Sequence, residues 1–370
     1  MSNKRFRVAI IGTGMIGQTA HIPSYLARPQ DVELVAAADI IEERAQKAAQ
    51  HFGIPAAYGD WQKMLDEVQP DIVSVCTPNV YHMGPTIGAL KAGAHVLCEK
   101  PISTSAANAK EMFDVAESVG RELFVTQTAR FSQSSMAAKE FADAGELGEM
   151  YYAETAPIRR RGIPKWGVFH IKEHNGGGPV YDIGVHSVDL LMWIMGNPKV
   201  EAVSGQTYLK FGNQDEGLAT SLADSGAPEG VLTPRPYDHR EFDVEDFASA
   251  YIRLENKATL VLRTAWAANT PDEAGKTYIL GTKGGLQLGP LEYISNMGSY
   301  QANTGLKLPR ERDVSFSGHF WAVEHAIKVL RGEEEKIVKR EEVINVMQLL
   351  DGIYLSAELG REVLADELAV

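Results

Sequence analysis

The sequence predicts an α/β protein in two parts: an N-terminal doubly wound parallel sheet, and a C-terminal domain whose largely antiparallel open sheet is covered by helices. Up to about residue 127, short apolar strands alternate with helical segments, which is the rhythm of a parallel sheet. Further along, strands follow one another with short turns, which favours antiparallel pairing. The 370 residues suffice for two cores. We place the domains at residues 1–127 and 128–370, with C-terminal helices able to pack back on the first domain.

Composition and charge restrict the function. The formal net charge of -13 argues against nucleic acid or an anionic membrane as a partner. Cys76 and Cys98, the two cysteines, both lie in apolar runs and are expected to be buried, reduced thiols without metal-ligand spacing. Reduced cysteines are typical of a cytoplasmic protein, which we therefore expect, and we find no signal peptide, lipidation signal or transmembrane span.

The first strand, residues 6–11, runs into a glycine-rich turn and then a helix. In this context Gly12 suits the tight turn, Gly14 allows a pyrophosphate to approach, and Gly17 lets the helix pack on the strand. Free N–H groups at the start of the helix favour phosphate. The segment therefore predicts a Rossmann fold in which the cofactor contacts Gly12, Thr13, Gly14, Met15, Ile16 and Gly17.

The second strand, residues 33–38, ends in Asp39. An acid about 20 residues after the glycine turn binds the ribose hydroxyls of NAD and repels the 2′-phosphate of NADP, so NAD is favoured and NADP disfavoured. Alternatively, Asp39 only caps the helix that follows it.

Further strand–helix units complete the first domain, with helices at 60–68, 83–91 and 106–119 and strands at 72–76, 95–98 and 122–127. Ligands bind beyond the carboxyl ends of such strands. Two turns fall there, and they add the expected cofactor contacts Thr77, Pro78, Asn79, His82, Glu99 and Lys100. Because Pro101 stiffens the second turn, the Lys100 ammonium projects from a fixed backbone.

The second domain begins with a helix near 136–144 and an apolar helix at 180–195, separated by strand-like segments. Strands are expected at 200–211, 247–254, 258–267, 277–280 and 286–288. Residues 212–245, rich in Gly, Pro and Asp, predict a long surface loop. Amphipathic helices at about 319–331 and 341–366 close the chain.

A polar stripe crosses the apolar helix at 180–195. Asp182, His186 and Asp189 follow the spacing i, i+4, i+7, which predicts one face of the helix. Either His186 is merely satisfied by the aspartate one turn before it, or the stripe is functional, because buried charge is unfavourable unless paired or used. Gly184 and the preceding glycine run predict the close approach of another helix or a ligand. A metal site in the stripe is disfavoured, and we expect no metal.

Together these motifs resemble the Gfo/Idh/MocA oxidoreductases, which act mostly on sugars and inositols. The resemblance spans nearly the whole chain, from the glycine turn through Glu99-Lys100-Pro101 and the Asp182/His186 helix to Gly281-Thr282-Lys283-Gly284-Gly285. It implies that Lys100 contacts nicotinamide and substrate, while Asp182 and His186 form the acid–base pair. The chain departs from the family at Thr128-Ala129-Arg130-Phe131, where many members have Asn-Arg-Arg-Phe.

The residue types suit the oxidation of a secondary alcohol by NAD. Loss of hydride requires removal of the hydroxyl proton, for which histidine is the default base, here His186. Asp182 would orient the imidazole, and Lys100 would stabilise the developing alkoxide. We therefore expect an NAD-dependent dehydrogenase that moves a hydride between nicotinamide and a secondary hydroxyl of a sugar, glycoside or inositol.

Other substrate contacts are expected outside this triad. The segment 159–166 is expected to cross the substrate cleft, with Arg160 binding hydroxyls and Trp166 stacking on a sugar ring; Arg130 is a further candidate. The alternative is a solvated, salt-bridged loop. His170, Lys172, Glu173 and His174 are additional polar candidates that the sequence does not rank.

Two other functions remain compatible with these motifs. One is an NAD-dependent glycoside hydrolase that oxidises its sugar transiently, eliminates the substituent and reduces the sugar again. The other is a non-catalytic NAD-sensing regulator, which the fold would permit. We also expect a homodimer or homotetramer, because a sheet covered by helices on one face leaves the other face to be buried against a copy.

Overall fold

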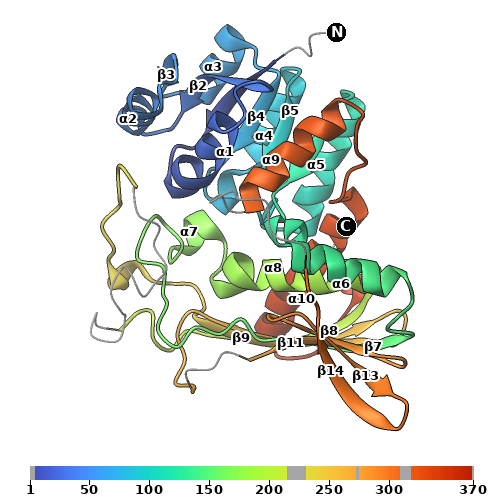
Figure 1. Cartoon of the computed structure of the whole chain (residues 1–370). Coiled ribbons are helices and arrows are strands. Elements are labelled where there is room, and N and C mark those ends of the chain that lie inside the picture. Colours follow the sequence, from blue (N-terminus) through green and yellow to red (C-terminus); the bar gives the residue numbers. More distant parts are fainter. Residues whose placement is uncertain (1–4, 215–230, 272–274, 309–317, 369–370) are drawn as a thin grey trace.

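The computed structural model describes residues 5–214, 231–271, 275–308 and 318–368. They form two sheets, one of six strands and one of nine, with helices packed around the first and between the two (Figure 1). The expected combination of a doubly wound parallel sheet and a largely antiparallel sheet covered by helices is confirmed.

The first sheet has the strand order β3-β2-β1-β4-β5-β6, and all of its pairs are parallel. Its strands are β1 (Phe6–Ile11), β2 (Val32–Ala38), β3 (Ala56–Tyr58), β4 (Ile72–Val75), β5 (His95–Cys98) and β6 (Leu123–Val125). The order reverses between β1 and β4, so the crevice beyond their carboxyl ends is the expected ligand site. The central strands β1 and β4 are almost wholly apolar and buried, which shows that both faces of the sheet are covered.

Helices on both faces connect these strands: α1 (Ile22–Leu26), α2 (Glu42–Phe52), α3 (Trp61–Val68), α4 (Met83–Lys91) and α5 (Ala106–Ser118). Side-chain caps fix two of the starts, since Asp60 accepts from the amide of Gln62 and Ser105 from that of Asn108. A helix from the far end of the chain, α9 (Gly318–Leu330), also packs here through Val323, Ala326 and Ile327.

The second sheet has the order β14-β13-β12-β11-β7-β10-β9-β8-β15. Only the pair β7–β10 is parallel. Its strands are β7 (Met150–Thr155), β8 (Val200–Tyr208), β9 (Phe247–Leu254), β10 (Thr259–Ala265), β11 (Thr277–Gly281), β12 (Gly285–Leu288), β13 (Glu292–Met297), β14 (Tyr300–Gly305) and β15 (Val363–Leu364).

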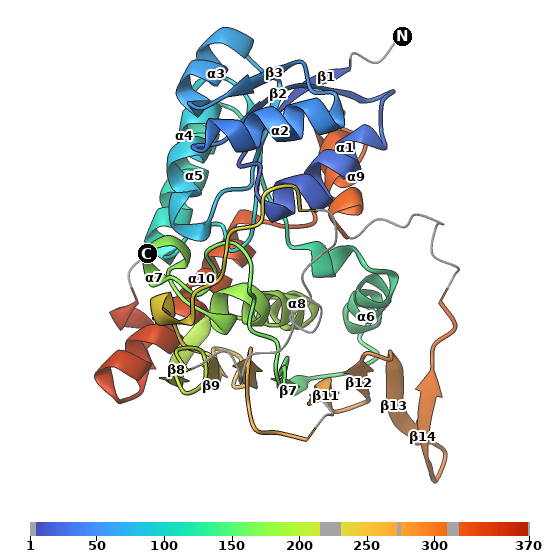
Figure 2. The ribbon, with the colours of Figure 1, turned by 90° about the vertical axis from the view of Figure 1, so that its left-hand side faces the viewer.

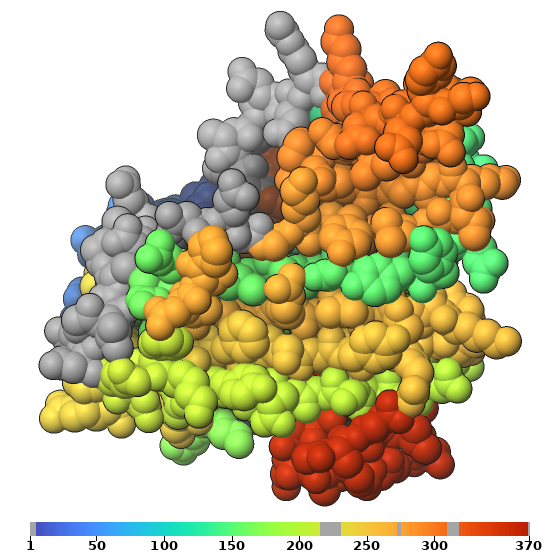
Figure 3. Space-filling model, turned by 90° about the horizontal axis from the view of Figure 1, so that it is seen from below, coloured from blue at the N-terminus to red at the C-terminus, as the bar shows by residue number. Residues whose placement is uncertain are grey.

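One face of the second sheet is covered by helices. α6 (Gln133–Asp143), α8 (Val185–Ile194) and α10 (Arg340–Leu359) lie between this sheet and the first domain (Figures 1 and 2). In β9, Ala248, Ala250 and Ile252 point into this core, while Tyr251 is exposed on the other side. Seen from below, the described segments of this sheet lie side by side at the surface, with the C-terminal segment (red) along one edge (Figure 3).

Several element boundaries differ from the sequence expectation. The last long helix ends at Leu359 instead of near residue 366, because Gly360 adopts a left-handed conformation that terminates it. The strand expected to reach residue 211 stops at Tyr208. The β13–β14 hairpin was not predicted, since its second strand, Tyr300–Gly305, lacks an alternating apolar pattern. Part of the loop expected at 212–245, residues 215–230, lies outside the described residues.

Cys76 and Cys98 are buried and unpaired, as expected. Burial raises the pKa of the Cys98 thiol to about 12, so this group stays protonated at neutral pH. Across the described segments, no helix combines the length and the apolar character needed to cross a membrane.

Candidate active site

The structure shows why glycine occupies two of the three positions in the turn after β1, and how the third position differs. Gly12 has φ +94°, and a Cβ there would lie 2.6 Å from the backbone carbonyl carbon and oxygen of Cys76. A Cβ on Gly17 would lie 2.4 Å from the carbonyl oxygen of Gly12. At Gly14, by contrast, a Cβ would meet no described atom within 4 Å. Packing therefore explains Gly12 and Gly17, whereas the open side of Gly14 suits the close approach of a dinucleotide phosphate.

Asp39 is tied to this turn. Its Oδ2 accepts from the amide of Thr13 at 2.9 Å and from the Thr13 hydroxyl at 3.2 Å, while Oδ1 accepts from the amide of Ile41 at 2.9 Å. Arg44 lies 3.4 Å from the same carboxylate. Asp39 does not occupy the cap position of α2, which is held by Ile41. The carboxylate is thus held against the glycine turn, and its contact with a ribose stays a prediction.

The helix after the glycine turn also contacts the long loop of the second domain. The side-chain amide of Gln18 donates to the Thr13 carbonyl at 2.6 Å, and its oxygen accepts from the amide of Leu232 at 2.8 Å. Residues just past the undescribed part of the loop are therefore fastened beside the expected cofactor site, a contact that no sequence motif indicates.

The turns after β4 and β5 are braced together by His82. This histidine is fully buried, and its Nδ1 and Nε2 lie 2.8 Å from the carbonyl oxygens of Pro101 and Thr77 respectively. Burial lowers the pKa of its imidazole. Both ring nitrogens face backbone oxygens, so His82 holds the two loops together, and its expected contact with cofactor stays a prediction. Asn79 similarly donates to the carbonyl of Asn175, 3.0 Å away.

Glu99 is buried below the second turn. Its Oε1 lies 2.8 Å from Nε2 of His21 and 3.0 Å from Nε2 of His319, and its Oε2 accepts from the amide of Lys100 at 3.1 Å. Burial opposes ionisation of the carboxyl, but the hydrogen bonds from the two histidines hold the pKa of Glu99 well below its usual range. Neither histidine was recognised in the sequence, because each lies far along the chain from Glu99.

Lys100 and Asp182 meet across the two domains. The Lys100 ammonium donates to the Asp182 carbonyl at 2.9 Å and lies 3.6 Å from its Oδ1. The other carboxylate oxygen, Oδ2, accepts from the indole Nε1 of Trp266 at 2.8 Å. Trp266 is fully buried at the end of β10, and the sequence indicated it only as part of a strand. The Asp182 carboxylate therefore has Lys100 near one oxygen and Trp266 bonded to the other.

His186 lies one turn beyond Asp182, but no hydrogen bond joins the two in the part of the chain that the structure describes. The helix begins with a π turn, Val180–Gly184, in which the amide of Val185 bonds to the Val180 carbonyl. A π turn rotates Asp182 away from the position that α-helical i, i+4 spacing predicts. The expected orientation of the imidazole by Asp182 is thus replaced by the contacts of Asp182 with Lys100 and Trp266.

The electrostatic surroundings keep His186 neutral. Burial lowers the pKa of its imidazole well below the ordinary value, and the positive charge of Lys100 lowers it further. Glu99 opposes this shift and His319 adds to it. A neutral imidazole beside an ammonium can accept a proton from a substrate hydroxyl.

The glycines around the helix pack against protein rather than ligand. A Cβ on Gly184 would lie 3.4 Å from a side-chain carbon of Thr264, so the element that approaches is strand β10 and not the expected helix or ligand. A Cβ on Gly178 would lie 2.0 Å from the carbonyl oxygen of Glu245. These glycines let the start of the helix approach the sheet and place Asp182 near Trp266.

The third residue of the stripe, Asp189, belongs to a separate cluster. Its carboxylate accepts two hydrogen bonds from Arg130, at 2.6 and 2.8 Å, and both side chains are fully buried. Arg130 also pairs with Glu342 and lies over the ring of Trp193. Because its guanidinium is enclosed by these partners, the structure places Arg130 in a structural ion-pair cluster and not in the substrate contact expected for it.

The two substrate-binding candidates in the segment 159–166 differ in exposure. Arg160 is exposed. Trp166 is 9% exposed and packs edge-on against Phe169, with ring centroids 5.9 Å apart. Its indole nitrogen has no hydrogen-bond partner among the described atoms. The expected role of this segment in substrate binding stays a prediction.

Comparison with known proteins identifies the family. Residues 6–127 match the Gfo/Idh/MocA oxidoreductase family over its NAD-binding Rossmann fold, and residues 139–364 match the C-terminal alpha/beta domain of the same family. The chain belongs to this family. The resemblance expected from the motifs is confirmed, and so is an NAD-binding Rossmann domain.

Individual relatives agree with this assignment. The chain of this Gfo/Idh/MocA oxidoreductase is 34% identical to D-glucoside 3-dehydrogenase of Escherichia coli K12 over 365 residues, 98% of each protein. It is 25% identical to inositol 2-dehydrogenase of Salmonella paratyphi B over 220 residues, 59% of this chain and 61% of that protein. Among solved structures, levoglucosan dehydrogenase in complex with NADH shares the fold, with a TM-score of 0.80 and 21% identity over 98% of this chain and 99% of that chain.

The glycine turn generates a first prediction. Gly14→Ala should leave the thermal unfolding midpoint nearly unchanged but weaken NAD binding by roughly tenfold or more, a loss of about 1.4 kcal/mol, because the new methyl group enters the space left for phosphate. Gly17→Ala should instead lower the midpoint, since its methyl group would meet the Gly12 carbonyl. Calorimetric titration with NAD and thermal melts distinguish the two; equal NAD affinity for Gly14→Ala and the unmodified protein would contradict the assignment.

A second prediction concerns the Arg130 cluster. Asp189→Ala should lower the free energy of unfolding by about 3–5 kcal/mol, because it leaves a buried guanidinium short of a partner, while NAD affinity of the folded protein is retained. The control Asp143→Ala removes an exposed partner of Lys139 and should change stability by less than about 1 kcal/mol. Denaturant titration measures both, and similar effects of the two substitutions would argue against a structural role for the pair.

Proposed function

We propose that this protein is an NAD-dependent dehydrogenase that oxidises a secondary hydroxyl of a sugar, glycoside or inositol, or reduces the corresponding ketone. The observation that carries the proposal is the meeting of the Lys100 ammonium with Asp182, beside a neutral His186 and beyond the carboxyl ends of β4 and β5. The full-length similarity to D-glucoside 3-dehydrogenase supports a glucoside as the first substrate to test.

The residues fit a bound dinucleotide, because Gly14 leaves open space at the turn and Asp39 stands where a ribose would lie. When NAD is bound, its nicotinamide accepts the hydride. His186 takes the hydroxyl proton, since its lowered pKa keeps the imidazole unprotonated. Lys100 donates to the same oxygen and stabilises the developing negative charge. Asp182, fixed by Trp266, holds the ammonium in place.

The function is tested with a panel of glucosides, aldoses and inositols, each incubated with NAD while NADH absorbance is followed. A steady rise in NADH with a glucoside supports the dehydrogenase. Cleavage of a glycoside without accumulation of NADH would instead indicate hydrolysis by transient oxidation. NAD binding without turnover of any member of the panel would favour a sensor.

The base generates a third prediction. His186→Ala should lower kcat by about 10²–10⁴-fold with NAD affinity almost unchanged, because only proton removal is lost. In the unmodified enzyme, the lowered pKa keeps the base competent at neutral pH, so the oxidation rate should fall only as the pH drops below the ordinary histidine range. His51→Ala, on an exposed helix end, is the control and should retain full activity. Normal turnover by His186→Ala would show that another group removes the proton.

A fourth prediction concerns the choice of cofactor. NAD should bind more tightly than NADP, because the Asp39 carboxylate repels a 2′-phosphate. Asp39→Ala should reduce the difference between the affinities for NAD and NADP. The substitution removes the negative charge, and it frees Arg44, which lies 3.4 Å from Asp39, to face the 2′-phosphate of NADP. The double variant Asp39→Ala/Arg44→Ala should bind NADP less well than Asp39→Ala alone. Equal affinities for both cofactors in the unmodified protein would exclude this role of Asp39.

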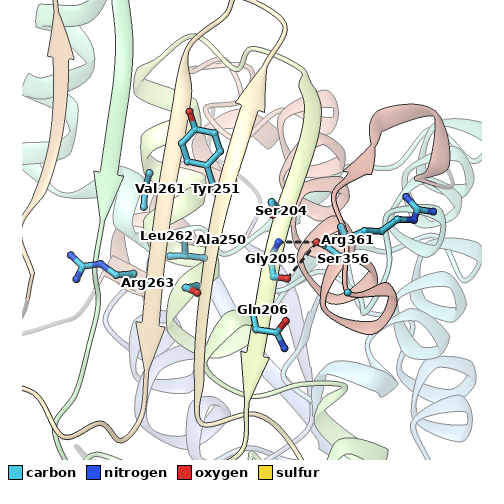
Figure 4. A pocket seen from close by; sticks show the side chains of 12 residues that line it. Ser204, Gly205, Gln206, Ala250, Tyr251, Val261, Leu262, Arg263, Ser356 and Arg361 are labelled. Carbon is cyan, nitrogen blue, oxygen red and sulfur yellow. Dashed lines mark hydrogen bonds between the residues drawn. The ribbon is translucent and has the colours of Figure 1, made fainter.

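We also propose that the protein forms a homodimer or homotetramer through the uncovered face of the second sheet. Tyr152, Tyr251 and Tyr278 lie on this face, and the adjacent strands β8, β9 and β10 enclose a shallow hollow bordered by Ser356 (Figures 3 and 4). A broad face with aromatic side chains is typically covered by a partner.

The two reduced, buried cysteines are consistent with a cytoplasmic location.

The fifth prediction follows from that face. Light scattering at micromolar concentration should give twice or four times the 40.5 kDa mass of one chain. Tyr251→Lys places a charge on the face and should shift the mass toward one chain, whereas Val119→Lys, at the exposed end of α5 in the first domain, should not. A mass of one chain for the unmodified protein would overturn the proposal.

A further inference from the structure

Three side chains from distant parts of the chain converge below the Lys100 turn. His21 lies at the end of the helical turn that follows the glycines, Glu99 follows β5, and His319 is the second residue of α9. One ligand atom from each lies within 4.8 Å of those of the other two. His21 and Glu99 are buried, and the side chain of His319 is 13% exposed, so the cluster is shielded from bulk water but can be reached from one side.

We propose that His21, Glu99 and His319 bind one divalent transition-metal ion, with Zn²⁺ as the best match. Two imidazole nitrogens and one carboxylate oxygen form a ligand set that zinc commonly uses, with a water molecule able to complete the coordination. The proposal does not depend on the proposed dehydrogenase activity, since it concerns residues that tie α9 to the first domain.

Two of the three ligand-atom separations are close to those around a bound ion, and the third is at most 4.8 Å. The two imidazole Nε2 atoms lie 2.8 and 3.0 Å from Oε1 of Glu99. With metal–ligand bonds of about 2.0–2.1 Å, each of these separations subtends an angle of roughly 90° at the metal. Opening that angle to the tetrahedral value requires separations of about 3.3 Å, so side-chain shifts of less than ~0.5 Å are enough. The two imidazole rings are tilted by 60° with centroids 5.3 Å apart, so their edges and not their faces converge on Glu99.

Outer hydrogen bonds fix two of the three ligands. The second nitrogen of His21, Nδ1, lies 3.1 Å from the hydroxyl of Ser74, which in turn lies 2.8 Å from the hydroxyl of Tyr25. An Nδ1–H that donates to Ser74 leaves the lone pair of Nε2 directed at the cluster. The second oxygen of Glu99 accepts from the amide of Lys100 at 3.1 Å, which leaves Oε1 for the metal. This arrangement is typical of protein metal sites, in which the free atom of each ligand is held by a neighbour.

The sequence could not indicate this site. Metal sites are found in sequences by short spacings between ligands, whereas residues 21, 99 and 319 come from three separate elements. The alternative that uses the same atoms is a clamp without metal, in which both imidazoles donate hydrogen bonds to one carboxylate oxygen. The two arrangements differ in one respect: the clamp needs only a hydrogen-bond donor at position 319, whereas the metal needs a lone pair on nitrogen there.

The experiment uses tag-free full-length protein and ZnCl₂ as the probe. Metal content is measured by elemental analysis after purification, after EDTA dialysis, and after zinc is restored. We expect about one zinc per chain, and we expect that zinc raises the thermal midpoint of the stripped protein, because a ligand that binds only the folded state stabilises it. His319→Gln keeps an amide that can donate to Glu99 but is a poor zinc ligand. It should fold and yet bind zinc more than about 100-fold more weakly, beyond the 10–100-fold that loss of an outer partner produces.

His51→Ala is the matched control, because it removes an exposed imidazole outside the cluster and should leave zinc binding unchanged. The proposal is overturned if the unmodified protein binds no zinc at a ratio near one per chain, or if His319→Gln binds zinc as the unmodified protein does. If His319→Gln and the unmodified protein have the same thermal unfolding midpoint, and EDTA does not change it, the cluster is the metal-free clamp. All these readouts are independent of dehydrogenase activity, so failure of the proposed function leaves this test intact.

Discussion

The candidate site depends on the contact between the Lys100 ammonium and Asp182, because these two residues come from different domains. Lys100 follows the fifth strand of the parallel sheet, and Asp182 lies in the π turn before α8, over the second sheet. Trp266 holds the carboxylate from below, so the ammonium has one fixed partner. The site therefore forms only when the domains are docked, and the contacts that dock them also determine its geometry.

Buried polar groups hold the segments around the candidate site. His82 joins the two turns that follow β4 and β5, and Asn79 links the first of them to the segment before the helix that carries His186. Arg130 and Asp189, a residue of α8, form a fully buried ion pair. Such groups are unfavourable when unpaired, so each fixes the relative position of the segments it joins. The polar residues nearest the site thus divide into those that face a ligand and those that hold the loops around it.

The electrostatics of the site follow from the same arrangement. The burial of His186 and the cation at Lys100 together keep the imidazole neutral, while the Glu99 carboxylate, in contact with two histidines, stays ionised. The acid and base states that alcohol oxidation requires are therefore set by burial and neighbouring charge. Membership of the Gfo/Idh/MocA family agrees with this chemistry, since its relatives include dehydrogenases named for sugar and inositol substrates.

The sequence by itself determined the class of both sheets and the close packing at Gly12 and Gly17, and it singled out Lys100, Asp182 and His186 as the candidate site, because strand rhythm, turn chemistry and motif spacing are local properties. It did not reveal that Asp182 faces Trp266 instead of His186, since a π turn changes the helical phase. Nor could it separate Asp189 and Arg130 from the site, or bring His319 to Glu99. Those outcomes depend on contacts between residues that are distant in the chain, and only the packing of the two domains decides them.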